Sequence, residues 1–366
     1  MWSENRLCIR WLVHQLLVAS ATYHLQTCVR GEPQVPCCFI FGDSLSDNGN
    51  NNLLPTAIKV NYFPYGIDFP GGATGRFSNN LTVPDYITKF VGINPLIPPY
   101  ANTSGSDILK GVNYASGAAG ILPETGTQYG VDISLESQIT NHRVTVARIT
   151  RRLGSIEAAQ RHLHSCLYYV KIGGNDYLND YFKPQYYPSS HIFNLTTFTD
   201  FLITIYSRQL RNLYELGARK VTVVGVGQIG CLPSQISQNG SCAQEENKAA
   251  SLFDSKLRSL VSQFNSQFSG DTASFIFVNA TAITTLNPHF LGLKFQRVPC
   301  CRNLVSSTGL CVENEKPCED REEYVFMDGF HNTDAANRIT ALSAYNASNP
   351  AFTYPTDINH LLSSSP

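Results

Sequence analysis

The sequence predicts an α/β protein with a three-layer α/β/α architecture, in which helices cover both faces of a mostly parallel sheet. Short apolar runs that end in Gly or Asn alternate along the chain with longer stretches that have the period of amphipathic helices. Strands and helices in alternation are joined by right-handed β-α-β crossovers, which give a parallel sheet covered on both sides. Neither an internal repeat nor a linker rich in Pro, Gly or Ser divides the chain, so we expect a single domain over residues 31–366.

Four short apolar runs are predicted to form buried parallel strands. Each is closed by a residue that favours turns, and each is too short for an amphipathic helix. The four runs are residues 37–41, 166–172, 220–226 and 274–278. Helices are predicted over residues 135–153, 198–216 and 244–268, and from Asp334 onward. Gly217 ends the second helical stretch in the manner of a C-cap.

Polar residues follow three of the predicted strands directly. Asp43 and Ser44 come after the first strand, Asn175 and Asp176 after the second, and Gln228 after the third. Ligands of open parallel sheets bind beyond the carboxyl ends of the strands, where these side chains should gather. They are therefore the first candidates for a functional site.

Composition favours a folded protein with an uncharged ligand. Of the 366 residues 43% are hydrophobic and 15% are charged, so a large core can form. The formal net charge of -1 gives no reason to expect a nucleic acid or an anionic membrane surface as an obligatory partner. We expect a small-molecule or lipid substrate and no cofactor.

The N-terminus has the features of a secretory signal peptide, which we expect within residues 1–30. Arg6 and Arg10 precede the apolar stretch 11–21, and small residues end that stretch. Polar residues interrupt the apolar run, so an amphipathic surface extension stays open as an alternative. No other stretch approaches the roughly 20 apolar residues that span a bilayer. The mature protein is therefore expected outside the cell, without a transmembrane segment.

Cysteines and glycosylation sequons agree with export. Cys231 and Cys242 flank a short loop, and four more cysteines crowd one segment: Cys300, Cys301, Cys311 and Cys318. No C-x-x-C pair is present among them, which favours disulfides over zinc, but the sequence does not choose between the possible pairings. Candidate glycan sites in Asn-x-Ser/Thr sequons are Asn80, Asn102, Asn194, Asn239, Asn279 and Asn346.

Ser44 is a candidate nucleophile because it directly follows a predicted strand at the carboxyl edge of the sheet. A serine hydroxyl is inert on its own, so it needs a histidine base that a carboxylate orients. The alternative is a helix N-cap, for which Ser and Asp are the usual residues. The G-x-S-x-G nucleophile elbow is not completed, since Ser46 stands at its last position.

Asp328 and His331 are the candidate acid and base. They stand three residues apart between the short apolar run 324–327 and the last predicted helix. In a turn, Asp328 can accept from the imidazole and leave the other ring nitrogen for Ser44. The alternative is that His331 or Asn332 caps the helix. A metal site is disfavoured, because the sequence lacks H-E-x-x-H.

Acyl transfer also needs hydrogen-bond donors for an oxyanion, and two further residues are candidates. Gly117, in a run of small residues, can offer a backbone N–H, and Asn175 can offer its side-chain amide. A close helix–sheet contact for the small residues and a turn for Asn175 are the structural alternatives.

Four segments, in this order, resemble the GDSL esterase/lipase family, also described as SGNH hydrolases, and its plant branch in particular. They are residues 41–50 with Ser44, residues 113–120 with Gly117, the G-x-N-D segment with Asn175, and the D-x-x-H segment from Asp328 to His331. The resemblance implies a flavodoxin-like central sheet and a Ser44, Asp328, His331 triad. It also implies an oxyanion hole made by the N–H groups of Ser44 and Gly117 and the Asn175 amide.

The resemblance implies hydrolysis of carboxylic acyl esters, from lipids or the cell wall, by a secreted enzyme; in a plant its location would be the cell wall or apoplast. It also supports disulfides among the cysteines named above. Met327 stands where tryptophan is common before the acid, and Asn332 where proline commonly follows the base. An acyltransferase that passes the acyl group to a hydroxyl acceptor and a catalytically silent binding protein are the alternatives.

Overall fold

The computed structural model describes residues 32–363, except residues 106, 272, 286–291 and 303–307. The expected signal peptide, residues 1–30, lies outside the described residues. From Gln34 onward the chain forms one compact unit.

The central sheet has the strand order β2-β1-β3-β4-β5-β8. Neighbouring strands are parallel from β2 to β5, and β8 adds an antiparallel edge. The order of the five parallel strands is that of flavodoxin-like folds. The strands are β1 Cys38–Gly42, β2 Gly111–Asn113, β3 Leu167–Lys171, β4 Lys220–Val224, β5 Ser274–Val278 and β8 Thr353–Tyr354. The predicted mostly parallel sheet is confirmed.

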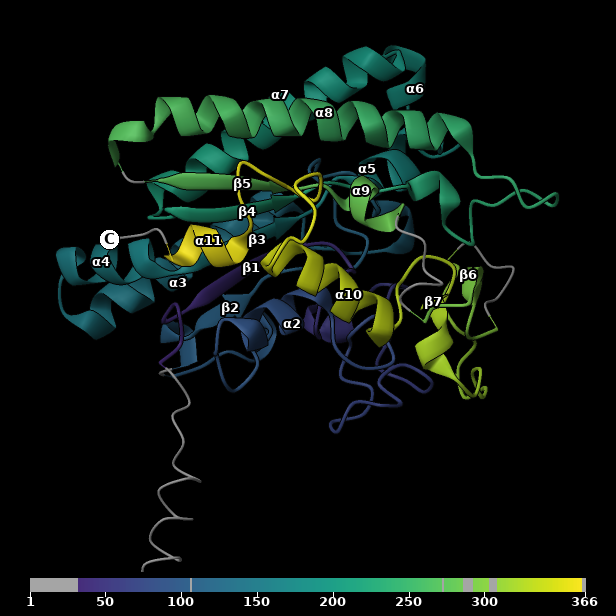
Figure 1. Ribbon diagram of the computed structural model, residues 1–366, viewed down its shortest axis with the longest axis horizontal. Coiled ribbons are helices and arrows are strands. Elements are labelled where there is room, and N and C mark those ends of the chain that lie inside the picture. Colours follow the sequence, from purple (N-terminus) through teal and green to yellow (C-terminus); the bar gives the residue numbers. More distant parts are fainter. Residues whose placement is uncertain (1–31, 106, 272, 286–291, 303–307, 364–366) are drawn as a thin grey trace, which may run out of the picture. The chain divides into compact units, whose positions relative to one another are not determined.

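Helices cover both faces of this sheet, as Figure 1 shows with α7 and α8 along one side and α10 and α11 along the other. Phe39 and Phe41 of β1 belong to a core shared with α3, α7 and α8. Cys38 and Ile40 of the same strand belong to a second core with α2, α10 and α11. Alternate residues of a strand thus serve opposite layers, and the predicted α/β/α architecture is confirmed.

The helices lie between the strands along the chain, except α11, which follows β8. The long ones are α2 Val83–Phe90, α3 Leu135–Leu153, α4 Ile156–Ser165, α7 Leu195–Glu215, α8 Gln244–Gln267 and α10 Asp334–Tyr345. The short ones are α5 Gly174–Asp176, α6 Ser189–Ile192, α9 Ala280–Thr284 and α11 Ile358–Ser363. Helix α7 begins before the predicted residue 198 because the side chain of Asn194 accepts the N–H of Thr197 and caps it.

A small parallel pair of strands, β6 Phe295–Pro299 and β7 Tyr324–Phe326, lies outside the main sheet. Strand β7 corresponds to the apolar run 324–327 and leads directly into Asp328. Two disulfides, Cys300–Cys318 and Cys301–Cys311, cross-link the chain beside this pair.

The disulfides expected from the sequence are present, together with one that was not expected. Cys231 pairs with Cys242 across a short loop, a pairing that the sequence had left open. Cys37 pairs with Cys166 and links the chain just before β1 to the chain just before β3. Sequence inspection placed both of these cysteines in strands and did not connect them, since 129 residues separate them.

The sequon asparagines differ in exposure. Four of them are exposed: Asn102, Asn194, Asn239 and Asn346. Asn80 and Asn279 are partly buried, and the side chain of Asn279 caps α9 by accepting the N–H of Ala282. Within the described residues, no helix is long and apolar enough to cross a membrane.

Candidate active site

Ser44 lies in the turn that follows β1, at the carboxyl edge of the sheet. Gln138 of α3 fixes the end of the strand, because its amide accepts the N–H of Gly42 at 2.9 Å and donates to the Gly42 carbonyl at 2.8 Å. A Cβ atom at Gly42 would lie 2.4 Å from the carbonyl oxygen of Lys171, so only glycine fits between β1 and β3.

Asp43, not Ser44, caps the turn. Its carboxylate accepts the N–H of Leu45 at 3.0 Å, and its carbonyl accepts the N–H groups of Ser46 and Asp47 at 3.0 Å each. The other carboxylate oxygen of Asp43 lies 3.7 Å from the buried ammonium of Lys171. The capping alternative for Ser44 is therefore wrong, and its hydroxyl is left for another partner.

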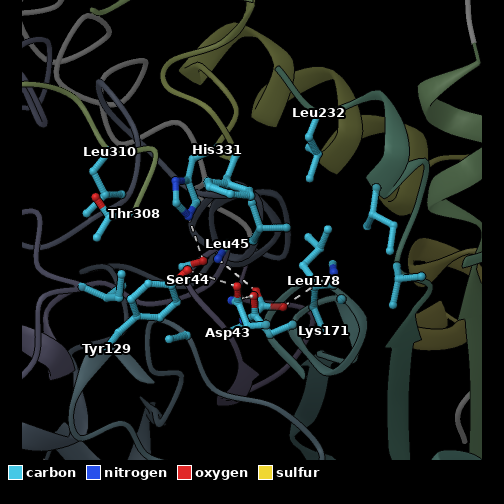
Figure 2. Close-up of a pocket in the computed structure, with 18 residues that line it drawn as sticks. Asp43, Ser44, Leu45, Tyr129, Lys171, Leu178, Leu232, Thr308, Leu310 and His331 are labelled. Atoms are coloured by element: carbon cyan, nitrogen blue, oxygen red, sulfur yellow. Dashed lines mark hydrogen bonds and ion pairs between the residues drawn. The ribbon is translucent and has the colours of Figure 1, made fainter. Parts of the chain in front are cut away.

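That partner is His331, which comes from the loop between β7 and α10. Its Nε2 lies 2.8 Å from Ser44 Oγ, although 287 residues separate the two along the chain. Figure 2 shows the ring pointing down at the Ser44 hydroxyl. Helix α10 is capped by Thr333, whose hydroxyl accepts the N–H of Ala336. His331 and Asn332 are therefore not the helix cap.

Asp328 orients the imidazole. Its carboxylate oxygens lie 2.8 and 2.9 Å from His331 Nδ1, and one of them also accepts the backbone N–H groups of Phe330 and His331 at 2.8 Å each. A carboxylate only accepts, so Nδ1 carries the hydrogen and Nε2 is left to accept from the Ser44 hydroxyl. Asp328 is completely buried. The three residues expected to act together therefore form one chain of hydrogen bonds.

Tyr65 is a part of this site that sequence inspection missed. Its hydroxyl donates to Asp328 Oδ2 at 2.5 Å and accepts the N–H of Cys311 at 3.0 Å. Burial and the neighbouring Asp328 carboxylate raise the pKa of Tyr65 well above its usual range, which keeps the hydroxyl protonated as a donor. No pattern around Tyr65 marks it in the sequence.

Met327, which replaces the common tryptophan, is fully buried beside the acid. Its N–H donates to the His331 carbonyl at 2.7 Å, and its carbonyl accepts the N–H of Cys301 at 2.9 Å. Its side chain packs in a small core with Tyr65 and the Cys301–Cys311 disulfide. The substitution thus leaves the loop that carries Asp328 and His331 firmly packed.

The N–H of Gly117, which we expected in the oxyanion hole, is engaged in hydrogen bonds with two side chains. Its N–H donates to carboxylate Oδ2 of Asp47 and to the side-chain oxygen of Asn51, at 3.1 Å each. Both acceptors lie in the polar loop behind Ser44, and this bonding ties that loop to the segment after β2. Asp47 is held in the interior, where burial raises its pKa to about 6.

Ala118, the next residue, lines the same cavity as Ser44 and His331. Its N–H has no hydrogen-bond acceptor within the described part of the chain, and the same holds for the N–H of Ser44. Ala118 has a φ of 71°, a left-handed conformation that is uncommon for residues other than glycine. Residues held in such conformations occur preferentially at functional sites.

Asn175 lies just beyond β3, where Gly173 allows the turn with a φ of 117°. The Asn175 amide donates to the Ala119 carbonyl at 3.0 Å, and its oxygen accepts from Asn179 at 2.9 Å. These two hydrogen bonds determine the orientation of the amide, that is, the positions of its oxygen and its nitrogen. One N–H of Asn175 is thereby used, and the second is available to the pocket that Asn175 lines.

Ser44, Asn175 and His331 border a common cavity of about 90 Å³. Apolar side chains make up much of its remaining wall, including Leu178 and Leu310. Such a pocket, with few polar groups that converge on one point, is typical of small-molecule sites.

A serine hydroxyl, an imidazole and a carboxylate linked in this order are the arrangement of serine hydrolases. Residues 38–343 match the family model described as GDSL-like Lipase/Acylhydrolase, and the chain belongs to this family of carboxylic ester hydrolases. GDSL esterase/lipase At1g29670 of Arabidopsis thaliana is 46% identical, over 91% of this chain and 93% of its own. GDSL esterase/lipase At4g18970 of the same plant is 41% identical, over 97% of this chain and 99% of its own.

Proposed function

We propose that this protein is a secreted serine hydrolase that cleaves carboxylic acyl esters of lipids or the cell wall, with Ser44, His331 and Asp328 as its catalytic triad. The observation that carries the proposal is the 2.8 Å contact between Ser44 Oγ and His331 Nε2, with Asp328 bonded to the other ring nitrogen. The names of the Arabidopsis relatives, GDSL esterase/lipase, support the same reaction class.

The reaction proceeds through an acyl-enzyme. His331 Nε2 takes the proton of the Ser44 hydroxyl as its oxygen attacks the ester carbonyl, and Asp328 stabilises the imidazolium that forms. The imidazolium then protonates the leaving alkoxide as the carbon–oxygen bond breaks. Water, deprotonated by the same imidazole, releases the acid and restores Ser44.

Three N–H donors stabilise the oxyanion in this proposal. They are the backbone N–H of Ser44, the backbone N–H of Ala118 in place of that of Gly117, and the second amide hydrogen of Asn175. The set is supported because Ser44, Ala118 and Asn175 all line the catalytic cavity. Donors that are fixed before the reaction need no reorganisation when charge develops.

Replacement of Ser44 tests the function. Ser44→Ala is expected to abolish hydrolysis of p-nitrophenyl esters while the thermal unfolding temperature stays close to that of the wild type. Ser46→Ala is the matched control, because Ser46 is also buried and its hydroxyl has no hydrogen-bond partner within the described residues. Undiminished hydrolysis by Ser44→Ala would remove Ser44 as the nucleophile.

Export is the second part of the proposal. Four disulfides support an oxidising location, because such bonds persist outside the cytosol. We propose a cleaved leader within residues 1–30, a single domain over residues 31–366, and a destination in the cell wall or apoplast. N-terminal sequencing of protein recovered from the medium of expressing plant cells tests the cleavage, and retention of residue 1 would contradict it.

A further inference from the structure

A second cavity, of about 220 Å³, adjoins the catalytic pocket. It lies at the carboxyl ends of β3 and β4 and is bordered by α9, α10 and the β6–β7 pair. It is more than twice the volume of the catalytic pocket, which measures about 90 Å³. No step of the proposed mechanism uses this space.

The two cavities share walls next to the reacting groups. Six residues line both of them: Leu45, Lys171, Val226, Ile229, Leu232 and Phe330. Leu45 follows the nucleophile in the chain, and Phe330 precedes the base. Figure 2 shows Leu45 beside Ser44 and Leu232 on the far side of the pocket. A group attached to the ester carbon or oxygen therefore has a short path from Ser44 into the second cavity.

The inner walls of the second cavity are aliphatic. Val224 of β4, Ile283 of α9 and Val325 of β7 contribute, together with small residues on two helices, Ala280 and Ala336. All but Val325 are buried in apolar clusters of the protein. An apolar ligand group gains free energy in such a space, whereas a polar group would lose its hydration there.

Two polar side chains of this cavity have partners within the protein, and two others lie at its rim. The amide of Asn337 donates to the Leu81 carbonyl at 2.9 Å, and the ammonium of Lys171 is paired with Asp43. Arg297 and Thr284 are exposed and lie where the cavity meets solvent. The buried ammonium of Lys171 is thus already paired, and the guanidinium of Arg297 lies at the solvent side of the cavity.

We infer that this second cavity holds the unbranched hydrocarbon chain of the ester, which makes fatty esters the substrate class of this enzyme. The inference rests on the proposed function and deepens it. A fatty acyl group and a fatty alcohol present the same hydrocarbon chemistry to the cavity, and the experiment below separates these two sources.

The test reduces the volume of the second cavity by substitutions on two of the helices that border it. Thr340→Trp on α10 and Ala280→Leu on α9 place larger side chains at its wall. Leu342→Trp and Ala282→Leu are matched controls on the same helices, since neither Leu342 nor Ala282 lines the cavity. Thermal unfolding of all four variants confirms that each is folded before the assays.

Two pairs of substrates give the kinetic readout. The acyl pair is p-nitrophenyl dodecanoate and p-nitrophenyl acetate, and the alcohol pair is dodecyl acetate and ethyl acetate. In one of the two pairs, the ratio of kcat/KM for the long over the short ester should fall about tenfold or more in Thr340→Trp and Ala280→Leu. The ratio should keep its wild-type value in the two controls. Ratios that match the controls in both pairs would overturn the inference.

A binding measurement separates this inference from the proposed function. Titration calorimetry of dodecanoate and dodecanol is carried out on Ser44→Ala and on the same variant with Thr340→Trp or Leu342→Trp added. Weaker binding of either ligand only when Thr340→Trp is present supports the cavity, even if no ester is hydrolysed by the wild type. Equal binding by the three proteins, or none, contradicts it.

Discussion

Tyr65 donates a hydrogen bond of 2.5 Å to Asp328 Oδ2, across 263 residues of sequence. The same hydroxyl accepts the N–H of Cys311, so it links the acid of the site to the chain next to the Cys301–Cys311 disulfide. Tyr65 does not border the catalytic pocket. We therefore propose that it acts on His331 through Asp328, as a positioning residue.

We predict that Tyr65→Phe lowers kcat by about tenfold to a hundredfold and leaves KM nearly unchanged. A hydrogen bond to a charged group contributes about 1.5 to 3 kcal/mol. If this free energy holds Asp328 in its reactive orientation, its loss raises the activation barrier by a similar amount. Tyr62→Phe is the control, because the Tyr62 hydroxyl donates to the carbonyl of Cys311 and not to the acid. Steady-state kinetics on a short p-nitrophenyl ester checks both variants, and equal kcat values in the two would contradict a role for Tyr65.

The Cys301–Cys311 disulfide is predicted to support activity as well as stability. Cys301 donates its N–H to the Met327 carbonyl, one residue before Asp328, and Cys311 donates to Tyr65. The pair Cys301→Ser and Cys311→Ser should lower both the unfolding free energy, by about 2 to 3 kcal/mol, and kcat.

Removal of the Cys231–Cys242 disulfide provides the comparison, since the two loops are similar, with sequence separations of 11 and 10. The loss of stability should be of the same order in both double variants. The loss of kcat on a short ester should be confined to the Cys301 and Cys311 variant. A similar fall of kcat in both would mean that the disulfide supports the fold and not the acid.

Asn175→Ala is predicted to lower kcat by about a hundredfold to a thousandfold with little change in stability. One oxyanion donor contributes about 2.7 to 4 kcal/mol to the stabilisation of the transition state. Asn179→Ala removes a neighbour that donates to the Asn175 oxygen but leaves the Asn175 amide in place, so its effect on kcat should be smaller. Single-turnover kinetics checks the acylation step, and an unchanged rate in Asn175→Ala would exclude the amide from the oxyanion hole.

Asp176, the neighbour of Asn175, is predicted to make stability depend on pH. Burial raises its pKa from 3.8 to about 7, against the opposing effect of the N–H groups of Ile121 and Leu122 that donate to it. A carboxyl with a raised pKa in the folded state contributes stability at low pH, and this contribution is lost as the pH rises from 3.8 to about 7.

The Asp176→Asn variant cannot ionise at this site, so its unfolding free energy should fall less between about pH 5 and pH 8 than that of the wild type. Its stability at any one pH is expected to be lower, because an amide accepts fewer hydrogen bonds than a carboxylate. Urea unfolding across this range measures the slope. The exposed Asp107→Asn serves as control and should reproduce the wild-type slope.

The sheet and the reacting groups could be predicted from the sequence because short local patterns indicate them. The run 274–278 became β5 with the same bounds, since a buried strand closed by Asn leaves a clear signal. Strand β2 was missed because Gly111–Asn113 is too short to show any period. The D-x-x-H spacing predicted Asp328 and His331 in one turn. Residues three apart can meet within a turn without any long-range contact.

Features that depend on long-range packing could not be predicted from local patterns. Tyr65 meets Asp328 only after the chain has folded, and nothing local marks it. The Cys37–Cys166 disulfide joins two apolar runs, and neither run shows in its own sequence that its cysteine has a distant partner. Gly117 was named as a donor because the small residues around it allow close approach to its backbone N–H and because of the family resemblance. The acceptors that occupy its N–H, Asp47 and Asn51, lie in a different loop.

The central claim is that Ser44 becomes covalently acylated during turnover, and mass spectrometry of labelled protein tests it most directly. The wild type is treated with an alkyl fluorophosphonate, which reacts with activated serines, and the digested protein is searched for the modified peptide. We predict a single phosphonyl group on Ser44 that is absent in His331→Ala and retained in Ser46→Ala. A folded wild-type protein that carries no label, or that carries it on another residue, would contradict the account.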